Sequence, residues 1–167
     1  MGVEPIPLSA FDDGAVARTA GDAIERARRA VGVRRTALFW LDATRGRLTC
    51  VATAGVGDRD RWVGQTLAAG LGMAGRAVRE GHPVWTPDLL ADPQVPIAPW
   101  LRDRLQAEGL TVVAAVPISL DGETRGALGF LDGPGRQYDH EGLLQIARLA
   151  DKVAAELVRG GSSRRCG

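Results

Sequence analysis

The sequence predicts an α/β domain of the α+β type, in which N- and C-terminal helices cover one face of a central antiparallel sheet. Helical apolar patterns occupy the two ends of the chain, and two pairs of strand-like runs, each joined by a short turn, lie between them. Strands joined by tight turns pair antiparallel. An irregular middle segment separates the pairs and is expected on the other face, with short helices and loops over a ligand pocket.

The first part of the chain supplies a helix and a hairpin. Apolar residues recur at three- and four-residue spacing over residues 13–31, with charged residues between them, which predicts an amphipathic helix. Gly32 follows as its C-cap. Strands are predicted over residues 36–42 and 47–53, because both runs are rich in apolar and β-branched residues.

The middle segment alternates short elements with loops. A short strand is predicted over residues 62–67, and a glycine-rich turn at residues 70–75 leads into a helix that ends near Glu80. A brief strand is expected at Val84–Thr86. A further helix is predicted over Pro99–Glu108, because proline suits the first turn of a helix and a glycine follows the last residue.

The last part of the chain has the strongest patterns. Strands over residues 111–120 and 124–131 are joined by Asp121 and Gly122, a pair favoured in tight hairpins. The final helix is predicted over residues 139–159, with one apolar face. The chain is therefore divided into an N-terminal extension at 1–11, one domain at 12–159 and a disordered tail at 160–167.

The composition excludes several classes of protein. Apolar residues make up 45% of the chain, and the net charge is +1 with no basic stripe, so no nucleic-acid partner is expected. No apolar run approaches the roughly 20 residues of a membrane span, and the N-terminus lacks a signal-peptide pattern, so no membrane partner is expected. Two cysteines, Cys50 and Cys166, make no disulfide framework, and a cytoplasmic location is expected.

A series of short motifs resembles the GAF domain family. In family order they are Leu38 to Asp42, Gly55, Gly70-x-Gly72-x-x-Gly75, Pro83 to Asp88, Asp92-Pro93, Gly109, Val116-Pro117-Ile118, Gly126-x-Leu128 and Tyr138-Asp139. The resemblance implies a GAF-like (profilin-like) fold with a pocket on the face opposite the terminal helices. It also implies a sensory or regulatory module of the kind found in sensor histidine kinases and related signalling proteins. The helices at 13–31 and 139–159 would form a homodimer.

Eight residues are candidates for the pocket. They are Trp62, Met73, Ala74, Arg76, Trp85, Asp88, Trp100 and Arg104. Four of them occupy the positions in the glycine turn and the middle helix where the resemblance places the pocket. The tryptophans of the middle segment suit a flat or cyclic ligand, although core packing would explain each of them as well. The aspartate is also explained by turn hydrogen bonds.

The glycine pattern at 70–75 also matches a dinucleotide fingerprint. That reading is rejected, because the following helix is only about two turns long and no parallel strand partner is expected. A smaller function remains open, in which the backbone N–H groups of this turn and Arg76 hold an anion.

No catalytic set, metal site or known cofactor site is found in the sequence. GAF-type methionine sulfoxide reductases carry a reactive cysteine where this chain has Ala74, and another in a segment that corresponds to cysteine-free residues 97–108. Haem- and bilin-binding members take histidine, or cysteine and histidine, from the segment at 92–108, which here has neither. The two histidines, His82 and His140, lie in different segments. The cofactor is therefore unknown.

Three functions remain open. The leading hypothesis is a sensory module that binds an unidentified small molecule and regulates an output domain of the same or a partner protein. The alternative is a ligandless dimerisation or scaffold module, with Trp62 or Trp100 filling the pocket. The third is an enzyme of the sulfoxide-reductase type or a haem sensor, which the missing cysteines and histidine argue against.

Overall fold

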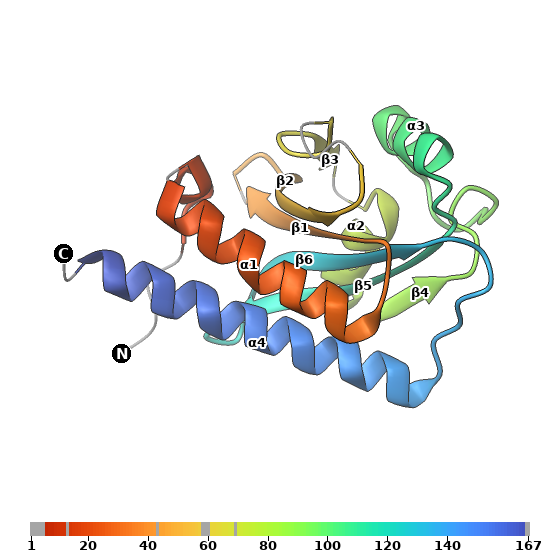
Figure 1. The fold of residues 1–167 in the computed structure, drawn as a ribbon. Helices are drawn as coiled ribbons and strands as arrows, with labels where there is room; N and C mark the ends of the chain where they lie inside the picture. Colours follow the sequence, from red (N-terminus) through yellow and green to blue (C-terminus); the bar gives the residue numbers. More distant parts are fainter. Residues whose placement is uncertain (1–5, 13, 43, 58–60, 69, 166–167) are drawn as a thin grey trace.

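The structure, a computed structural model, describes residues 6–12, 14–42, 44–57, 61–68 and 70–165. Asp13, Cys166 and the turn residue at 43 lie outside this described part. Among the described residues, six strands form one antiparallel sheet in the order β3-β2-β1-β6-β5-β4 (Figure 1). The strands are β1 (Arg35–Asp42), β2 (Arg47–Gly55), β3 (Thr66–Ala68), β4 (Val84–Thr86), β5 (Val112–Leu120) and β6 (Glu123–Asp132). The predicted antiparallel α/β fold is confirmed.

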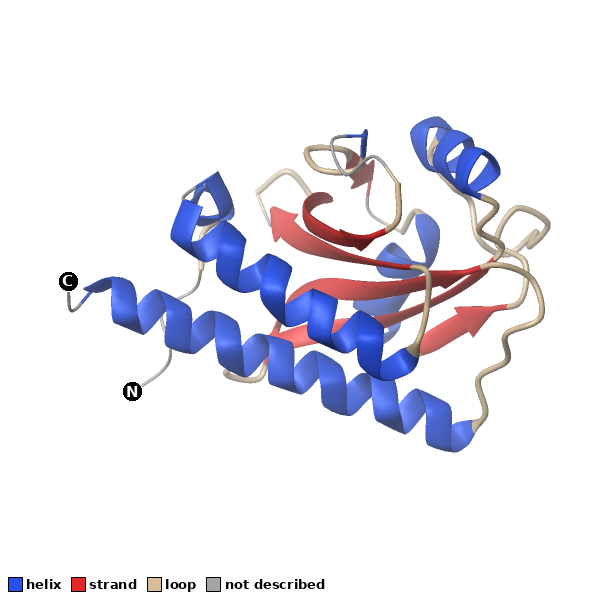
Figure 2. Cartoon of the chain, in the orientation of Figure 1, coloured by secondary structure: helices blue, strands red, loops and turns tan. Residues whose placement is uncertain are grey.

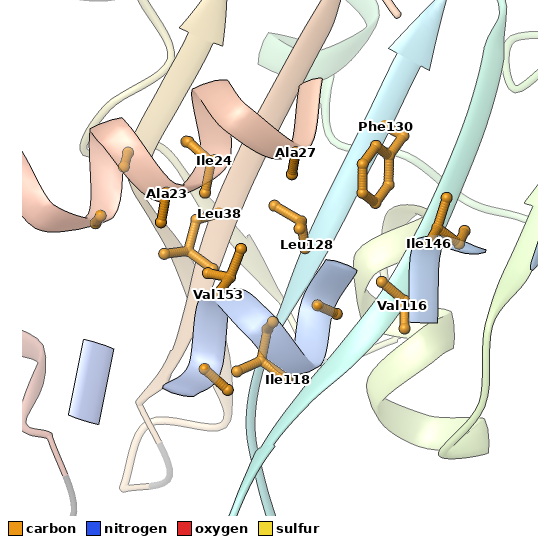
Figure 3. Close-up of a cluster of buried hydrophobic side chains, with 14 of the residues drawn as sticks. Ala23, Ile24, Ala27, Leu38, Val116, Ile118, Leu128, Phe130, Ile146 and Val153 are labelled. Carbon is orange, nitrogen blue, oxygen red and sulfur yellow. The ribbon is translucent and has the colours of Figure 1, made fainter. Parts of the chain in front are cut away.

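Two long helices form a layer on one face of this sheet. They are α1 (Gly14–Val31) and α4 (His140–Arg165), and they run side by side in front of the strands (Figure 2). Figure 3 shows apolar side chains of both helices meeting those of the central strands. The contacts come from Ile24 of α1, Ile146 and Val153 of α4, and Leu38 and Phe130 of the sheet, all buried.

The other face carries the middle segment. Helix α2 (Gly72–Glu80) lies behind the sheet, and α3 (Pro99–Glu108) stands near its end (Figure 1). A second buried cluster, separate from the one under α1 and α4, fills the space between these helices and the strands. The sheet therefore has two apolar faces, with a helical layer on one and, on the other, a roof made from residues 56–57, 61–68 and 70–110.

Local geometry explains where the strands turn and change face. Asp121 and Gly122 both have positive φ, 54° and 78°, as the tight turn between β5 and β6 requires. A bulge between Leu38 and Phe39 of β1 shifts the register with β2. Cys50 therefore faces the roof, whereas Ala52 faces α1, although simple alternation along a strand would place the two on one face.

Three segments differ from the sequence prediction. The short strand expected at 62–67 is instead the three-residue β3 at Thr66–Ala68, because Gly64 takes φ +93° and residues 62–64 form a turn. Helix α4 continues to Arg165, so most of the expected tail at 160–167 is helical. The short 3-10 helix η1 (Leu8–Asp12) packs its Phe11 ring 5.1 Å from Trp40, so the expected extension contributes to the core.

Candidate ligand pocket

A small apolar cavity lies between the sheet and its roof. Its volume is about 20 Å³. Its lining consists of Phe39, Val113, Ala115, Gly129 and Leu131 from the strands, and Trp62, Leu67, Met73, Ala74, Leu89 and Leu101 from the roof. A space of this size is close to that of a single water molecule, and an apolar lining offers water no partners. In this structure the pocket therefore has room for about one water molecule and offers it few polar partners.

Small residues in the sheet create the space that the roof fills. Ala115 of β5 pairs with Gly129 of β6, and Gly129 pairs in turn with Ala37 of β1. These three neighbours form a shallow floor with almost no side-chain volume. Trp62 is fully buried and lines the same cavity as Ala115 and Gly129.

Trp62 is held by three partners. Its ring lies 5.8 Å from that of Trp100 in an edge-to-face arrangement with an interplanar angle of 86°. Its Nε1 donates a hydrogen bond to Oε2 of Glu108 at 2.7 Å. The guanidinium of Arg35 lies over the ring, 5.1 Å from its centroid, as in a cation–π contact.

Arg35 is the charged centre of this arrangement and is only 1% exposed. Its Nε donates to Oε1 of Glu108 at 2.8 Å, its Nη1 to Oγ1 of Thr53 at 2.8 Å and its Nη2 to the carbonyl of Val56 at 2.6 Å. A buried guanidinium needs such partners, because an unpaired charge inside a protein is strongly destabilising. The network connects β1, β2, the turn at Trp62 and the last residue of α3.

The structure separates the predicted pocket residues into groups. Trp62, Met73 and Ala74 line the cavity. Trp100 is half-buried beside Trp62, and its Nε1 donates to the carbonyl of Thr66 at 2.7 Å. Arg104, also on α3, is half-buried and does not line the cavity.

The remaining candidates lie elsewhere. Trp85 of β4 is directed to the opposite face, where its ring lies 5.7 Å from that of Tyr138, so it is removed from the pocket. Asp88 is exposed, and its Oδ1 accepts a hydrogen bond from the N–H of Ala91, which is the turn role weighed for it. Arg76 pairs with Glu80 one turn along α2, at 2.9 Å.

At the start of α2, where an anion site was considered, groups of the chain itself bind some of the donors that an anion would use. The N–H of Gly72 donates to the carbonyl of Pro96 at 2.8 Å. The N–H of Gly75 continues the helix by bonding Leu71 at 3.2 Å. Together with the pairing of Arg76 to Glu80, these bonds occupy Arg76 and two of the backbone N–H groups that were considered for an anion.

Cys50 is buried against the roof, and burial raises the pKa of its thiol to about 12. A thiol in this state is a poor nucleophile. His82 and His140 are both exposed. Within the described part of the chain, no group of three histidine, cysteine, aspartate or glutamate residues is arranged to hold a metal ion.

Sequence reasoning did not identify Arg35 and Glu108. The strand was predicted to begin one residue after Arg35, so its side chain was never assigned to a face. Alternation along β1 places Arg35, Ala37 and Phe39 on the roof side, and this pattern was a usable signal. The partner lies 73 positions along the chain, and no local pattern indicates that pairing.

The sequence matches the GAF domain family model over residues 15–157. The chain belongs to the GAF domain family. GAF domains are generally sensory or regulatory modules, and this chain is a module of that general kind. A search of curated proteins found no match. No helix in the described ranges is both long and apolar enough to cross a membrane.

Solved structures share the fold at low sequence identity. The GAF domain of a phosphoenolpyruvate-protein phosphotransferase from Coxiella burnetii has a TM-score of 0.73 and 21% identity, over 92% of this chain and 88% of that one. The second GAF domain of DevS from Mycobacterium smegmatis has a TM-score of 0.69 and 19% identity, over 91% of this chain and 99% of that one. Free methionine-R-sulfoxide reductase from Neisseria meningitidis, solved with its substrate, has a TM-score of 0.67 and 20% identity, over 93% of this chain and 86% of that one.

Proposed function

We propose that this GAF domain is the sensory module of a bacterial-type signalling protein, such as a sensor histidine kinase, and has no catalytic role of its own. A small molecule would bind between the sheet and its roof. The observation that supports this most is that β1, β5 and β6 contribute side chains to both faces of the sheet, to the cavity on one and to the α1/α4 layer on the other. Successive residues of these strands face the cavity and the α1/α4 layer in turn, as Phe39 and Leu38 do.

Binding requires the roof to open, because the cavity of about 20 Å³ is too small for a metabolite. Helix α3 is the part best suited to move. It is fastened by two buried leucines, Leu101 and Leu105, and by the polar contacts of Trp100 and Glu108 at its two ends. Glycine with φ +67° follows its last residue, so the chain can change direction there at little steric cost.

A ligand drives such a switch through its preference for the open state. Moving a two-state equilibrium from 1:99 to 99:1 takes about 5.5 kcal/mol of differential binding, a preference of about 10⁴-fold. The cavity of the closed state has no room for a metabolite, so a ligand that needs the open roof has a strong preference for that state. A shift in the floor strands would change how α1 and α4 pack, and that change would reach the output domain.

The helical layer is the proposed homodimer surface. A groove of about 380 Å³ runs between α1 and α4, lined by small and apolar residues such as Ala27, Ala30, Leu149 and Val153. Arg26 and Glu156 form an ion pair across the groove. Analytical ultracentrifugation tests this surface. A dimer that becomes a monomer in Leu149→Glu supports it, and a monomeric wild-type domain refutes it.

A ligandless scaffold is the second candidate, and the small volume of the cavity, with the buried Trp62 in its lining, favours that interpretation. Native mass spectrometry of the purified domain and a thermal-shift screen of metabolites separate the two. A bound or stabilising small molecule supports the sensory function. A dimer that carries nothing, and whose melting temperature no compound raises, supports the scaffold.

A further inference from the structure

A second hollow lies outside the inner cavity, at the end of the sheet where α3 meets β1. This end groove is lined by Arg34, Val56, Gly57, Glu108 and Leu110, and its volume is about 390 Å³. Among the described residues, it shares no lining residue with the inner cavity. Trp62 stands between the two, because its ring lines the cavity while its Nε1 bonds Glu108, a residue of the groove.

Glu108 of the groove lining forms a buried ion pair with Arg35, which does not itself line the groove. Arg35 is 1% exposed, and the side chain of Glu108 is 15% exposed. Gly57, with φ +116°, packs directly on the pair, because a Cβ at this position would lie 2.8 Å from Nη2 of Arg35 and 3.2 Å from Oε1 of Glu108. A ligand in the groove therefore reaches Arg35 only through the position that the Glu108 carboxylate occupies.

The donors that Glu108 meets match a carboxylate group. Nε of Arg35 donates a hydrogen bond to Oε1 of Glu108 at 2.8 Å, and Nε1 of Trp62 donates one to Oε2 at 2.7 Å. Two N–H groups that each meet one oxygen of the same planar group are a recognition geometry for carboxylates. The remaining nitrogens of Arg35 are bonded to Thr53 and Val56, so the guanidinium is fixed in place whichever carboxylate it meets.

Glu108 is a movable occupant of this site. It is the last residue of α3, and Gly109 follows in the left-handed conformation with φ +67°. Its carboxylate can leave the donors by rotation of its own side chain, which is 15% exposed. Arg35 has no such freedom, because three of its nitrogens are bonded to different parts of the sheet and its loops.

We propose that the end groove binds a small monocarboxylate with an apolar body. The ligand carboxylate replaces that of Glu108 on Arg35 and Trp62, and the apolar body lies against Val56 and Leu110. Val56 is 85% exposed, which is unusual for an apolar side chain of this size, and Leu110 is buried beneath the groove. Arg34 lies at the rim, 57% exposed, and its charge is shared with Asp132, whose Oδ1 lies 3.7 Å from its Nε.

Occupation of the end groove would also release one end of the roof. Glu108 is one of the polar contacts that fasten α3, so a ligand that displaces it loosens the helix above the inner cavity. The proposal does not depend on a ligand in the inner cavity, since the two spaces have separate linings.

Benzoate is a suitable probe, and benzamide is its uncharged counterpart. The wild-type domain is titrated to tens of millimolar benzoate while the four tryptophan indole N–H signals are followed by NMR. We expect the Trp62 signal to move and to saturate, while that of Trp40, which bonds the carbonyl of Ile6, stays in place. Benzamide is expected to leave the Trp62 signal unchanged.

The Glu108→Gln variant removes the internal competitor. A tethered carboxylate acts at an effective concentration in the millimolar range, so its loss should tighten benzoate binding about tenfold or more. Glu80→Gln is the matched control, because it breaks an ion pair with Arg76 on α2, away from the groove. Calorimetry should show tighter binding only for Glu108→Gln.

The outcomes decide the proposal even if Glu108→Gln does not fold. A static Trp62 signal in wild-type protein at saturating benzoate overturns it, as does an equal response to benzamide. Equal benzoate affinity in a folded Glu108→Gln variant and in Glu80→Gln also overturns it. A metabolite that binds the inner cavity supports the proposed sensory function alone, because it perturbs Met73 without competing with benzoate.

Discussion

Replacing Trp62 by alanine tests whether this one side chain fills the space between sheet and roof. The indole is fully buried in the structure. Burial of a tryptophan removes about 150–250 Å² of surface from water, and each Å² contributes about 25 cal/mol, which gives about 4–6 kcal/mol. Truncations of this kind cost about 3–5 kcal/mol. We therefore expect the free energy of unfolding to fall by about 4 kcal/mol.

The measurement is urea unfolding followed by circular dichroism. With an m-value of about 2 kcal/mol/M, the expected loss lowers the midpoint by about 2 M urea. Free indole should then restore part of the stability, because the variant has a cavity of matching shape next to Phe39 and Met73. At ten times its Kd, the ligand would return about 1.4 kcal/mol.

Trp85→Ala is the matched control, since Trp85 is half-buried on the opposite face and its removal opens towards solvent. It should lose stability without any response to indole. A loss below about 1 kcal/mol for Trp62→Ala would refute the packing described for this residue. A full loss with no indole response would show that the roof collapses onto the floor, and it would favour the scaffold function.

Three further measurements test other parts of the structure. In a Cys166→Ser background, Cys50 should resist iodoacetamide at pH 8 until the protein is unfolded, because a thiol with a pKa of about 12 is about one part in ten thousand thiolate; rapid native labelling would contradict its burial. Burial also raises the pKa of Tyr138 to about 12, so the unfolded state loses this proton first and the stability should fall by about 2–3 kcal/mol between pH 10 and 12. Urea titrations across this range check it, and Tyr138→Phe should lack that part of the fall. Gly126→Ala places a Cβ 2.1 Å from a carbonyl oxygen of β1 and should cost more than about 2 kcal/mol, whereas Gly21→Ala, with open space around it, should be neutral or stabilising by up to about 1 kcal/mol, and equal urea midpoints for the two would refute the close approach.

The sequence was sufficient for most of the fold because each central element has a clear local signal. Helix α3 begins and ends where its proline and its C-terminal glycine predict. Strands β5 and β6 turn at Asp121 and Gly122 as expected. The failures lie where local pattern and tertiary packing disagree. The residues next to Trp62 in the sequence are typical of a strand. Trp62 lies instead in a turn, where its ring packs against Trp100 and Arg35.

The candidate site was predicted less completely, for a physical reason. Which face a residue of a short edge strand occupies depends on its pairing, and Trp85 pairs with Ala114, whose side chain lies under the α4 layer. Met73 and Ala74, predicted from the glycine turn, both line the inner cavity, because α2 begins at that turn. The Arg35–Glu108 pair forms because two segments far apart in the sequence come into contact, and no local pattern in a single sequence predicts that contact.

The two outermost strands belong to the roof, and this limits how the roof can move. Strands β3 and β4 have three residues each, while their neighbours β2 and β5 have nine. If the whole roof lifted, both long strands would be left with unpaired backbone groups, and such edges recruit strands from other molecules. Helix α3 contributes no strand, so it can swing out while both edges stay covered. The architecture thus allows a moving lid without the aggregation that an open sheet would invite.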